Sequence, residues 1–277
     1  MGQSIVTRGD ILAVYAHPDD ESWSCAGLFS YYGLRGLESR LLTATYGEAG
    51  FQPEIVERTP EHQRKATREA ELGEAARIVG LAGFEIIGFP DGVLESCLAA
   101  LEQAVAERML RYRPRIVITF DETGVTGHRD HIAVHAATTA AFAKVAPPGS
   151  RLLYNILPER VNAVVTAAVG SESPGNPVER FVIKKWNGPP PQKDGSAGAF
   201  CVPDDRIAVV LDVRAFVDAK RDAILAHRSQ VAGSSFLSQL PKGVLEAFLG
   251  WEYFQLGAGP AYPKLPAQDV FEGMDLD

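Results

Sequence analysis

The sequence predicts an α/β fold in which a Rossmann-like, mostly parallel sheet is flanked by helices and followed by a C-terminal extension. Short β-branched runs alternate with longer helical patterns through the first half of the chain, which is typical of successive βαβ units. The chain has 277 residues, 46 % of them hydrophobic, and can fill a substantial core. We therefore expect a single domain that spans residues 1–277.

Each expected strand is a short apolar run bounded by polar or turn-forming residues. Between the third and fourth strands, apolar residues recur every three or four positions from Leu94 to Met109, so this helix should pack one face on the sheet. The strands are expected at Ile11–Tyr15, Arg40–Thr45, Glu85–Gly88, Arg115–Phe120 and Leu152–Ile156, and the helices at Trp23–Arg35, Glu61–Val79, Leu94–Tyr112 and His131–Lys144.

The second half of the chain contains a long polar segment. Residues 166–205 are rich in Gly, Pro, Ser and Asn, and a loop of this length within a compact domain usually has a function. We expect it to be a loop or lid insertion that forms part of a pocket rim. A strand-like run at Ile207–Leu211 and a helix near Val217–Gln230 follow it.

Composition excludes several kinds of partner. A net charge of −8, a pI near 5.3 and the lack of a basic patch argue against nucleic acid binding. No apolar run approaches the roughly 20 residues that cross a bilayer, and the N-terminus lacks a signal-peptide pattern. We expect a cytoplasmic protein with no membrane partner, whose three scattered cysteines are reduced. Association into a homo-oligomer is left open.

A polar cluster follows the first expected strand. The strand Ile11–Tyr15 runs directly into the sequence AHPDDE, so His17, Asp19 and Asp20 lie just past its carboxyl end. In open parallel sheets, ligands bind at that edge. The fixed φ of Pro18 produces a bend that can direct the neighbouring imidazole and carboxylates toward one point.

A second polar cluster follows the strand expected at Arg115–Phe120. Asp121 and the sequence GVTGHRDH come after it and bring His128, Asp130 and His131 to the same edge of the sheet. Three of the six histidines thus fall in the two clusters. A purely structural role gives no reason for such grouping.

Together the two clusters offer ligands for a catalytic metal ion. A catalytic zinc has about three imidazole or carboxylate ligands and keeps an open position for water. His17, Asp20 and His131 would supply such a set, which leaves Asp19 free to take a proton from that water. We expect Zn²⁺ as the cofactor, with other divalent ions possible.

These two signatures resemble those of the LmbE-like, or PIG-L-type, family of zinc-dependent N-acetylglucosaminyl deacetylases. The similarity extends to a G-E-x-G turn at residues 47–50, an R-x-x-E-L helix at residues 68–72 and an F/Y-P-D-G turn at residues 89–92. Near the C-terminus, the AHRSQ segment that contains His227 resembles a further family segment. The resemblance is close over the first half of the chain and loose over the AHRSQ region.

The resemblance implies roles for individual residues. It agrees with the zinc ligands named above and with Asp19 as general base. His128 would lie across the metal as an imidazolium that stabilises the oxyanion or protonates the departing amine, and Asp130 would orient a histidine. Four residues are expected to bind the substrate, namely Arg68, Asp91, Glu48 and His227.

Several of these positions also have a structural alternative. Arg68 could pair with Glu71 on its own helix, and Asp91 could cap a turn. His135 lies one helical turn beyond the second cluster, and we expect it to face the sheet rather than a metal. His62 begins a charged helix and is expected to be solvated.

Two positions depart from the patterns of known subfamilies. Thr126 stands where mycothiol-pathway members resemble one another in having a tyrosine that can polarise the scissile carbonyl. Tyr46 precedes the G-E-x-G turn, where many bacillithiol-type relatives have arginine. The substrate within the family is therefore left open.

The sequence as a whole predicts an N-deacetylase in which metal-activated water hydrolyses the acetamide of an N-acetylglucosaminyl or similar small molecule. One alternative is an amidase of the same family that acts on a thiol conjugate. Another is a non-catalytic metal- or sugar-binding protein, although Asp19 beside the ligands argues against a purely structural metal. A nucleotide-dependent oxidoreductase is disfavoured because no G-x-G-x-x-G follows the first strand.

Overall fold

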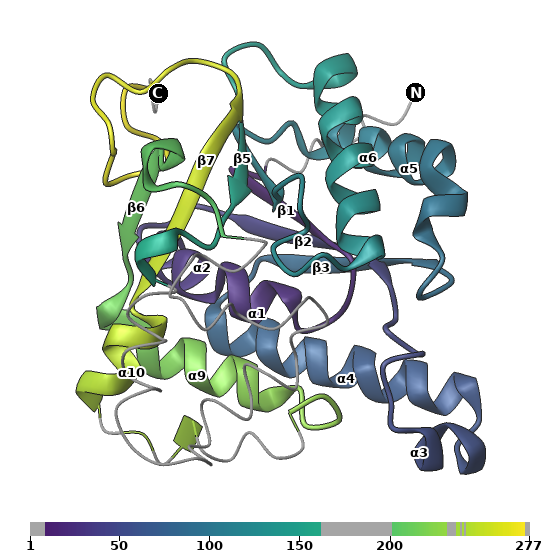
Figure 1. The fold of residues 1–277 in the computed structure, drawn as a ribbon. Helices are drawn as coiled ribbons and strands as arrows, with labels where there is room; N and C mark the ends of the chain where they lie inside the picture. Colours follow the sequence, from purple (N-terminus) through teal and green to yellow (C-terminus); the bar gives the residue numbers. More distant parts are fainter. Residues whose placement is uncertain (1–8, 162–200, 232–236, 239, 241, 275–277) are drawn as a thin grey trace.

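A mostly parallel sheet with helices on both faces forms the centre of the molecule (Figure 1). The computed structural model describes residues 9–161, 201–231, 237–238, 240 and 242–274. In this part, seven strands follow the order β3-β2-β1-β4-β5-β7-β6. Strands β1 to β5 are parallel to one another, whereas β7 is antiparallel to both β5 and β6. The predicted α/β class and its parallel sheet are thus confirmed.

The strands agree with the sequence-based expectation except at the C-terminus. Every residue of the central strands β1 and β4 is buried, as their apolar runs predict. The unexpected strand is β7, whose first residues alternate between part-buried and buried. Since one of the buried residues is Glu252, its sequence lacks the alternation of apolar and polar residues that predicts a half-buried strand. The strands are β1 Ile11–Tyr15, β2 Ser39–Thr45, β3 Gly83–Phe89, β4 Ile116–Phe120, β5 Arg151–Asn155, β6 Val209–Asp212 and β7 Trp251–Ala258.

The helices differ from the expectation mainly at one break. The helix expected at Trp23–Arg35 is divided at Cys25, whose φ of −136° is not helical. Two short helices, α3 and α10, were not expected. The helices are α1 Asp20–Ser24, α2 Ala26–Gly33, α3 Pro53–Arg58, α4 Glu61–Val79, α5 Leu98–Tyr112, α6 Arg129–Val145, α9 Val217–Ala226 and α10 Lys242–Leu249. None of the described helices is both long and apolar enough to cross a bilayer.

The crossovers between parallel strands place the helices in two layers. α5 and α6 pack together on one face of the sheet, and α1, α2, α4 and α9 lie on the other (Figure 1). All parallel strands therefore end at the same edge, where the two polar clusters of the sequence follow β1 and β4. Of the expected loop or lid at 166–205, residues 166–200 lie outside the described part of the chain.

A buried ion pair ties the C-terminal elements to α2. Lys220 of α9 contacts Glu252 of β7 at 2.6 Å, and their side chains are 3 % and 1 % exposed. The Glu252 carboxylate also accepts hydrogen bonds from the backbone N–H groups of Gly27 and Leu28, both at 2.9 Å. A distant carboxylate thus caps the first turn of α2, which explains why a new helix begins after Cys25.

Lys220→Met should therefore destabilise the protein strongly. The substitution leaves the Glu252 charge buried without its partner, which typically costs about 3–5 kcal/mol of the free energy of unfolding. The matched control is Lys242→Met, because Lys242 lies 3.9 Å from Glu246 in an exposed pair and should change stability by less than about 0.5 kcal/mol. Urea unfolding measures both, and equal effects would contradict this account of the pair.

Candidate metal centre

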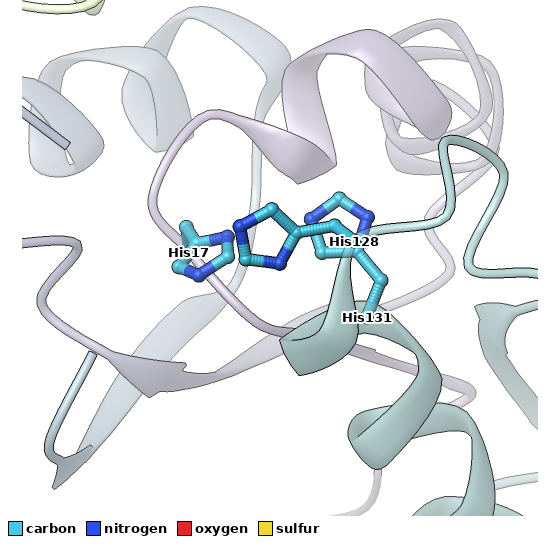
Figure 2. A group of neighbouring side chains, drawn as sticks. All are labelled: His17, His128 and His131. Atoms are coloured by element: carbon cyan, nitrogen blue, oxygen red, sulfur yellow. The ribbon is translucent and has the colours of Figure 1, made fainter. Parts of the chain in front are cut away.

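The two polar clusters meet where β1 and β4 end side by side in the sheet. His17 follows β1, whereas His128 and His131 lie at the start of α6, after β4. Figure 2 shows the three imidazoles grouped together. Their ring centroids are separated by 4.9 Å for His17 and His128, 5.3 Å for His17 and His131, and 4.8 Å for His128 and His131.

Asp20 lies between two of these imidazoles. One of its carboxylate oxygens is 3.5 Å from Nδ1 of His17, and the other is 3.3 Å from Nε2 of His131. Two ligands that bind a tetrahedral zinc at about 2.0–2.2 Å lie roughly 3.3–3.6 Å apart. The two oxygens of Asp20 therefore lie at such distances from Nδ1 of His17 and Nε2 of His131.

Two other groups of side chains in the described residues also have donor atoms close enough to share a metal. The donor atoms of His17, His128 and His131 lie within 4.8 Å of one another, and so do those of His17, Asp91 and Asp130. The expected set with Asp20 is not one of the groups that meet this distance, although it shares two histidines with the first. The set that a metal ion could use depends on which ring nitrogen of each histidine is free to bind it.

The outer nitrogens of two histidines are already engaged. Nε2 of His17 lies 3.0 Å from Asp91 Oδ1 and 3.3 Å from Asp130 Oδ2, so Nδ1 is the nitrogen directed at Asp20. Nδ1 of His131 lies 2.9 Å from the Gly124 carbonyl, to which it donates, and Nε2 is left. Such outer partners fix the tautomer and ring orientation of a metal-binding histidine. Burial by itself lowers the pKa of His17, but the surrounding carboxylates outweigh it and raise that pKa.

Asp130 connects His17 to a turn after β3. Its two oxygens accept the backbone N–H groups of Gly92 at 2.7 Å and Leu94 at 3.0 Å. Burial alone would raise the pKa of Asp130, but the His17 hydrogen bond and these two N–H groups lower it to about 2. Asp130 is thus an ionised, buried carboxylate that positions a histidine and does not line the cavity.

Asp19 has a strained backbone that its neighbours hold in place. Its φ is 125°, a region that residues other than glycine rarely adopt. Its backbone N–H donates to Glu21 Oε2 at 2.9 Å, and the other oxygen of Glu21 contacts Nε2 of His227 at 2.8 Å and the Ser22 hydroxyl at 2.6 Å. Glu21, whose role the sequence did not reveal, therefore links the end of α9 to the loop after β1.

His227 is placed differently from the sequence-based expectation. Its side chain is fully buried and is not among the residues that line the cavity, where it was expected to approach the substrate. The reason is its ion pair with Glu21: burial alone lowers the pKa of His227, but the Glu21 charge outweighs burial and raises it. His227 supports the loop that carries Asp19.

Arg68 and Asp91 line a cavity of about 630 Å³ together with Asp19 and the metal-site histidines. Arg68 donates from Nη2 to the Pro18 carbonyl, whereas its Nε and Nη1 are buried without a hydrogen-bond partner in the described structure. A Cβ on residue 47 would lie 2.5 Å from Arg68 Nη2, which explains the glycine there. The alternative pairing with Glu71 is absent, because Glu71 binds the backbone and hydroxyl of Ser229.

Glu48 and His135 lie outside the cavity lining. Glu48 lies behind Asp91, from whose backbone N–H it accepts a hydrogen bond at 3.4 Å, and is 3.6 Å from Lys65 Nζ. The expected contact of Glu48 with substrate stays a prediction. His135 has its Nδ1 at 2.9 Å from the Phe120 carbonyl, as expected for a histidine that faces the sheet.

His128 lines the cavity. Its Nδ1 accepts a hydrogen bond from the backbone N–H of Asp130 at 3.2 Å and so caps α6. Burial lowers the pKa of His128, and the nearby charges of His17 and His131 lower it further, which disfavours the expected imidazolium. A neutral ring in this arrangement carries its proton on Nε2. Thr126, also in the lining, stands where relatives were expected to have tyrosine.

Comparisons with known proteins found relatives that match nearly the whole chain. A 1D-myo-inositol 2-acetamido-2-deoxy-alpha-D-glucopyranoside deacetylase from Nakamurella multipartita is 31 % identical over 302 residues, which cover 96 % of this chain and 97 % of that protein. The family model described as GlcNAc-PI de-N-acetylase matches residues 12–142, a span that contains both polar clusters.

Solved structures share the fold at lower identity. An N,N'-diacetylchitobiose deacetylase from Pyrococcus horikoshii has a TM-score of 0.56 and 16 % identity, covering 89 % of this chain and 82 % of its own. A 4-carboxy-2-hydroxymuconate hydratase from Pseudomonas putida KT2440 has a TM-score of 0.60, also at 16 % identity, covering 93 % and 99 %. Since these two catalyse different reactions, such likeness shows the fold alone.

The similarity to the Nakamurella protein extends over nearly the whole of both chains. Together with the family model match, it confirms the resemblance seen in the sequence. The chain belongs to the PIG-L family of de-N-acetylases, hydrolases that act on the amide bond of an acylated amino sugar.

Proposed function

We propose that this protein is a zinc-dependent N-deacetylase that hydrolyses the acetamide of a small N-acetylglucosaminyl compound. One observation carries the proposal: Nδ1 of His17 and Nε2 of His131 flank the two oxygens of Asp20 at 3.5 and 3.3 Å. The other nitrogen of each ring is held by carboxylates or a carbonyl. Such an arrangement is typical of a site organised for a metal ion.

We assign the metal to His17, Asp20 and His131. His128 is less suited as a ligand because its Nδ1 caps α6 and its Nε2 carries the proton. The Asp91 and Asp130 group is less suited because Asp130 is committed to two backbone N–H groups. A bound zinc ion supplies a Lewis acid for the carbonyl oxygen and lowers the pKa of a water molecule to about 7.

The reaction then needs a base and a hydrogen-bond donor, and the cavity lining contains both. Asp19 accepts the proton of the attacking water at its carboxylate and can return it to the departing amine. Neutral His128 donates its Nε2–H to the oxygen on which negative charge develops. Nη2 of Arg68 lies 3.8 Å from the Asp19 carboxylate, so the two side chains form an ion pair beside the cavity.

The sugar is recognised beside this site. Arg68 has two unpartnered donor atoms, and Asp91 has an ionised carboxylate since its pKa is lowered, the hydrogen bond and charge of His17 outweighing the effect of burial. Both suit sugar hydroxyls. The Nakamurella relative is named for a glycoside of inositol and acetylated glucosamine, which supports a substrate of this type. The proposal includes a cytoplasmic location, in agreement with three free cysteine thiols.

Substitutions of the two adjacent aspartates test the assignment. Asp20→Asn, like His17→Ala, should lower zinc content because it removes a ligand, whereas Asp19→Asn should retain zinc and lose turnover by a factor on the order of 10²–10⁴. Metal analysis and release of free amine from N-acetylated glucosamine compounds measure the two effects. If Asp19→Asn lost the metal and Asp20→Asn kept it, the two carboxylates would be misassigned.

A substitution behind the site tests the support of Asp19. His227→Gln should lower kcat by about 10- to 100-fold, the usual effect of removing an outer support, with zinc content and KM near those of the parent. The reason is that Glu21 loses its charged partner and no longer fixes the strained loop. His62→Gln, on the exposed start of α4, is the control and should change nothing. An unchanged kcat for His227→Gln would refute this support.

A further inference from the structure

The cavity beside the metal centre has an apolar wall that the proposed acetyl substrate does not need. This wall is formed by one residue of α1, the exit of β5, the end of α10 and the start of β7. Its members are Trp23, Ile156, Leu157, Phe248, Trp251 and Tyr253.

Most of the wall lies on a definite side of the metal centre. Ile156 donates its backbone N–H to the Tyr253 carbonyl at 3.1 Å, so the exit of β5 and the start of β7 are adjacent. In the sheet, β7 is two strands from β4 and three from β1. With strands about 4.8 Å apart, the exit of β5 lies roughly 5 Å from β4 and the start of β7 roughly 10 Å from it.

The proposed sugar-binding groups lie on the opposite side. Asp91 follows β3, the edge strand beyond β2 and β1. Its backbone partner Ala49 follows β2, and Arg68 also contacts the Gly47 turn there. Across the sheet, the order is therefore sugar-binding groups, metal centre and apolar wall.

The charges near the wall do not make it suitable for a polar ligand. The charged residues of the described lining on this side are Lys220 and Glu252, which contact each other at 2.6 Å and are almost fully buried. The Glu252 oxygens are also occupied by two backbone N–H groups. Apart from Asn155 and the polar atoms of the aromatic residues, this side of the lining offers few partners for the hydroxyl groups of a polyol.

We propose that the site also removes apolar N-acyl groups longer than acetyl, and favours them, with the chain lying along this wall. An amide bound at the metal centre with its sugar toward Asp91 would direct its acyl group to the opposite side, toward β5 and β7. The cavity of about 630 Å³ is of the size that encloses a ligand larger than one monosaccharide. This inference rests on the proposed amide hydrolysis and adds the acyl group to it.

A series of substrates tests the inference. Glucosamine carrying N-acetyl, N-butanoyl, N-hexanoyl or N-octanoyl groups is given to the zinc-loaded full chain, and release of glucosamine is measured. We expect kcat/KM to rise about two- to fourfold per added methylene up to hexanoyl, as burial of each methylene predicts. Flat or falling kcat/KM with intact acetyl hydrolysis would overturn the inference and leave the proposed function standing. If neither this series nor the acetylated inositol glycoside were hydrolysed, both the inference and the proposed function would be overturned.

A second arm places the apolar group on the other end of the substrate. Octyl N-acetylglucosaminide carries its chain on the anomeric oxygen and keeps the acetyl group. The inference predicts less gain from this chain than from N-octanoyl glucosamine. A larger gain from the octyl glycoside would overturn it, because the wall would then bind the aglycone.

Two wall variants and a matched control locate the effect. Phe248→Ala should reduce the ratio of hexanoyl to acetyl kcat/KM at least fivefold, and Leu157→Trp should reduce it by filling the wall without creating a void. Val244→Ala is the control, because Val244 lies on the same helix but is 43 % exposed and outside the lining. Unchanged ratios in both wall variants would overturn the inference even if the parent preferred longer chains.

Discussion

The contact between Asp130 and His17 is the constraint on which the site depends. One buried carboxylate at the start of α6 receives a hydrogen bond from the loop after β1 and two from the turn after β3. Three segments distant in sequence are thereby held at one edge of the sheet. Because this contact uses Nε2 of His17, it also determines that Nδ1 faces Asp20. The fold thus selects the nitrogen that the proposed metal would bind.

The C-terminal elements complete the site although they supply none of the proposed metal ligands. His227, which directly follows α9, stabilises Glu21 and, through it, the strained backbone of Asp19. Lys220 and Glu252 fix α9 and β7 to the start of α2. Three of the six residues of the apolar wall lie on α10 and β7. The extension therefore has two roles, since it supports the reactive loop and shapes the far end of the cavity.

Much of this architecture was predictable because it depends on local sequence. The fully buried strands β1 and β4, and the polar clusters that follow them, can each be recognised from a few consecutive residues. In the same way, α4 ends where Gly80 adopts a φ of 73°. Features that depend on distant residues were not predictable. The break at Cys25 follows from Glu252, and the burial of His227 follows from Glu21. The lowered pKa of His128 likewise reflects its burial and two neighbouring histidines, which a sequence motif does not show.

A crystal structure of the zinc-loaded protein, with anomalous data collected at the zinc absorption edge, tests the central claim most directly. The account predicts one strong peak within bonding distance of His17 Nδ1, His131 Nε2 and a carboxylate oxygen of Asp20, with His17 Nε2 still on Asp130. A peak bonded to His17 Nε2 together with Asp91 and Asp130, or to His128 in place of Asp20, would contradict it.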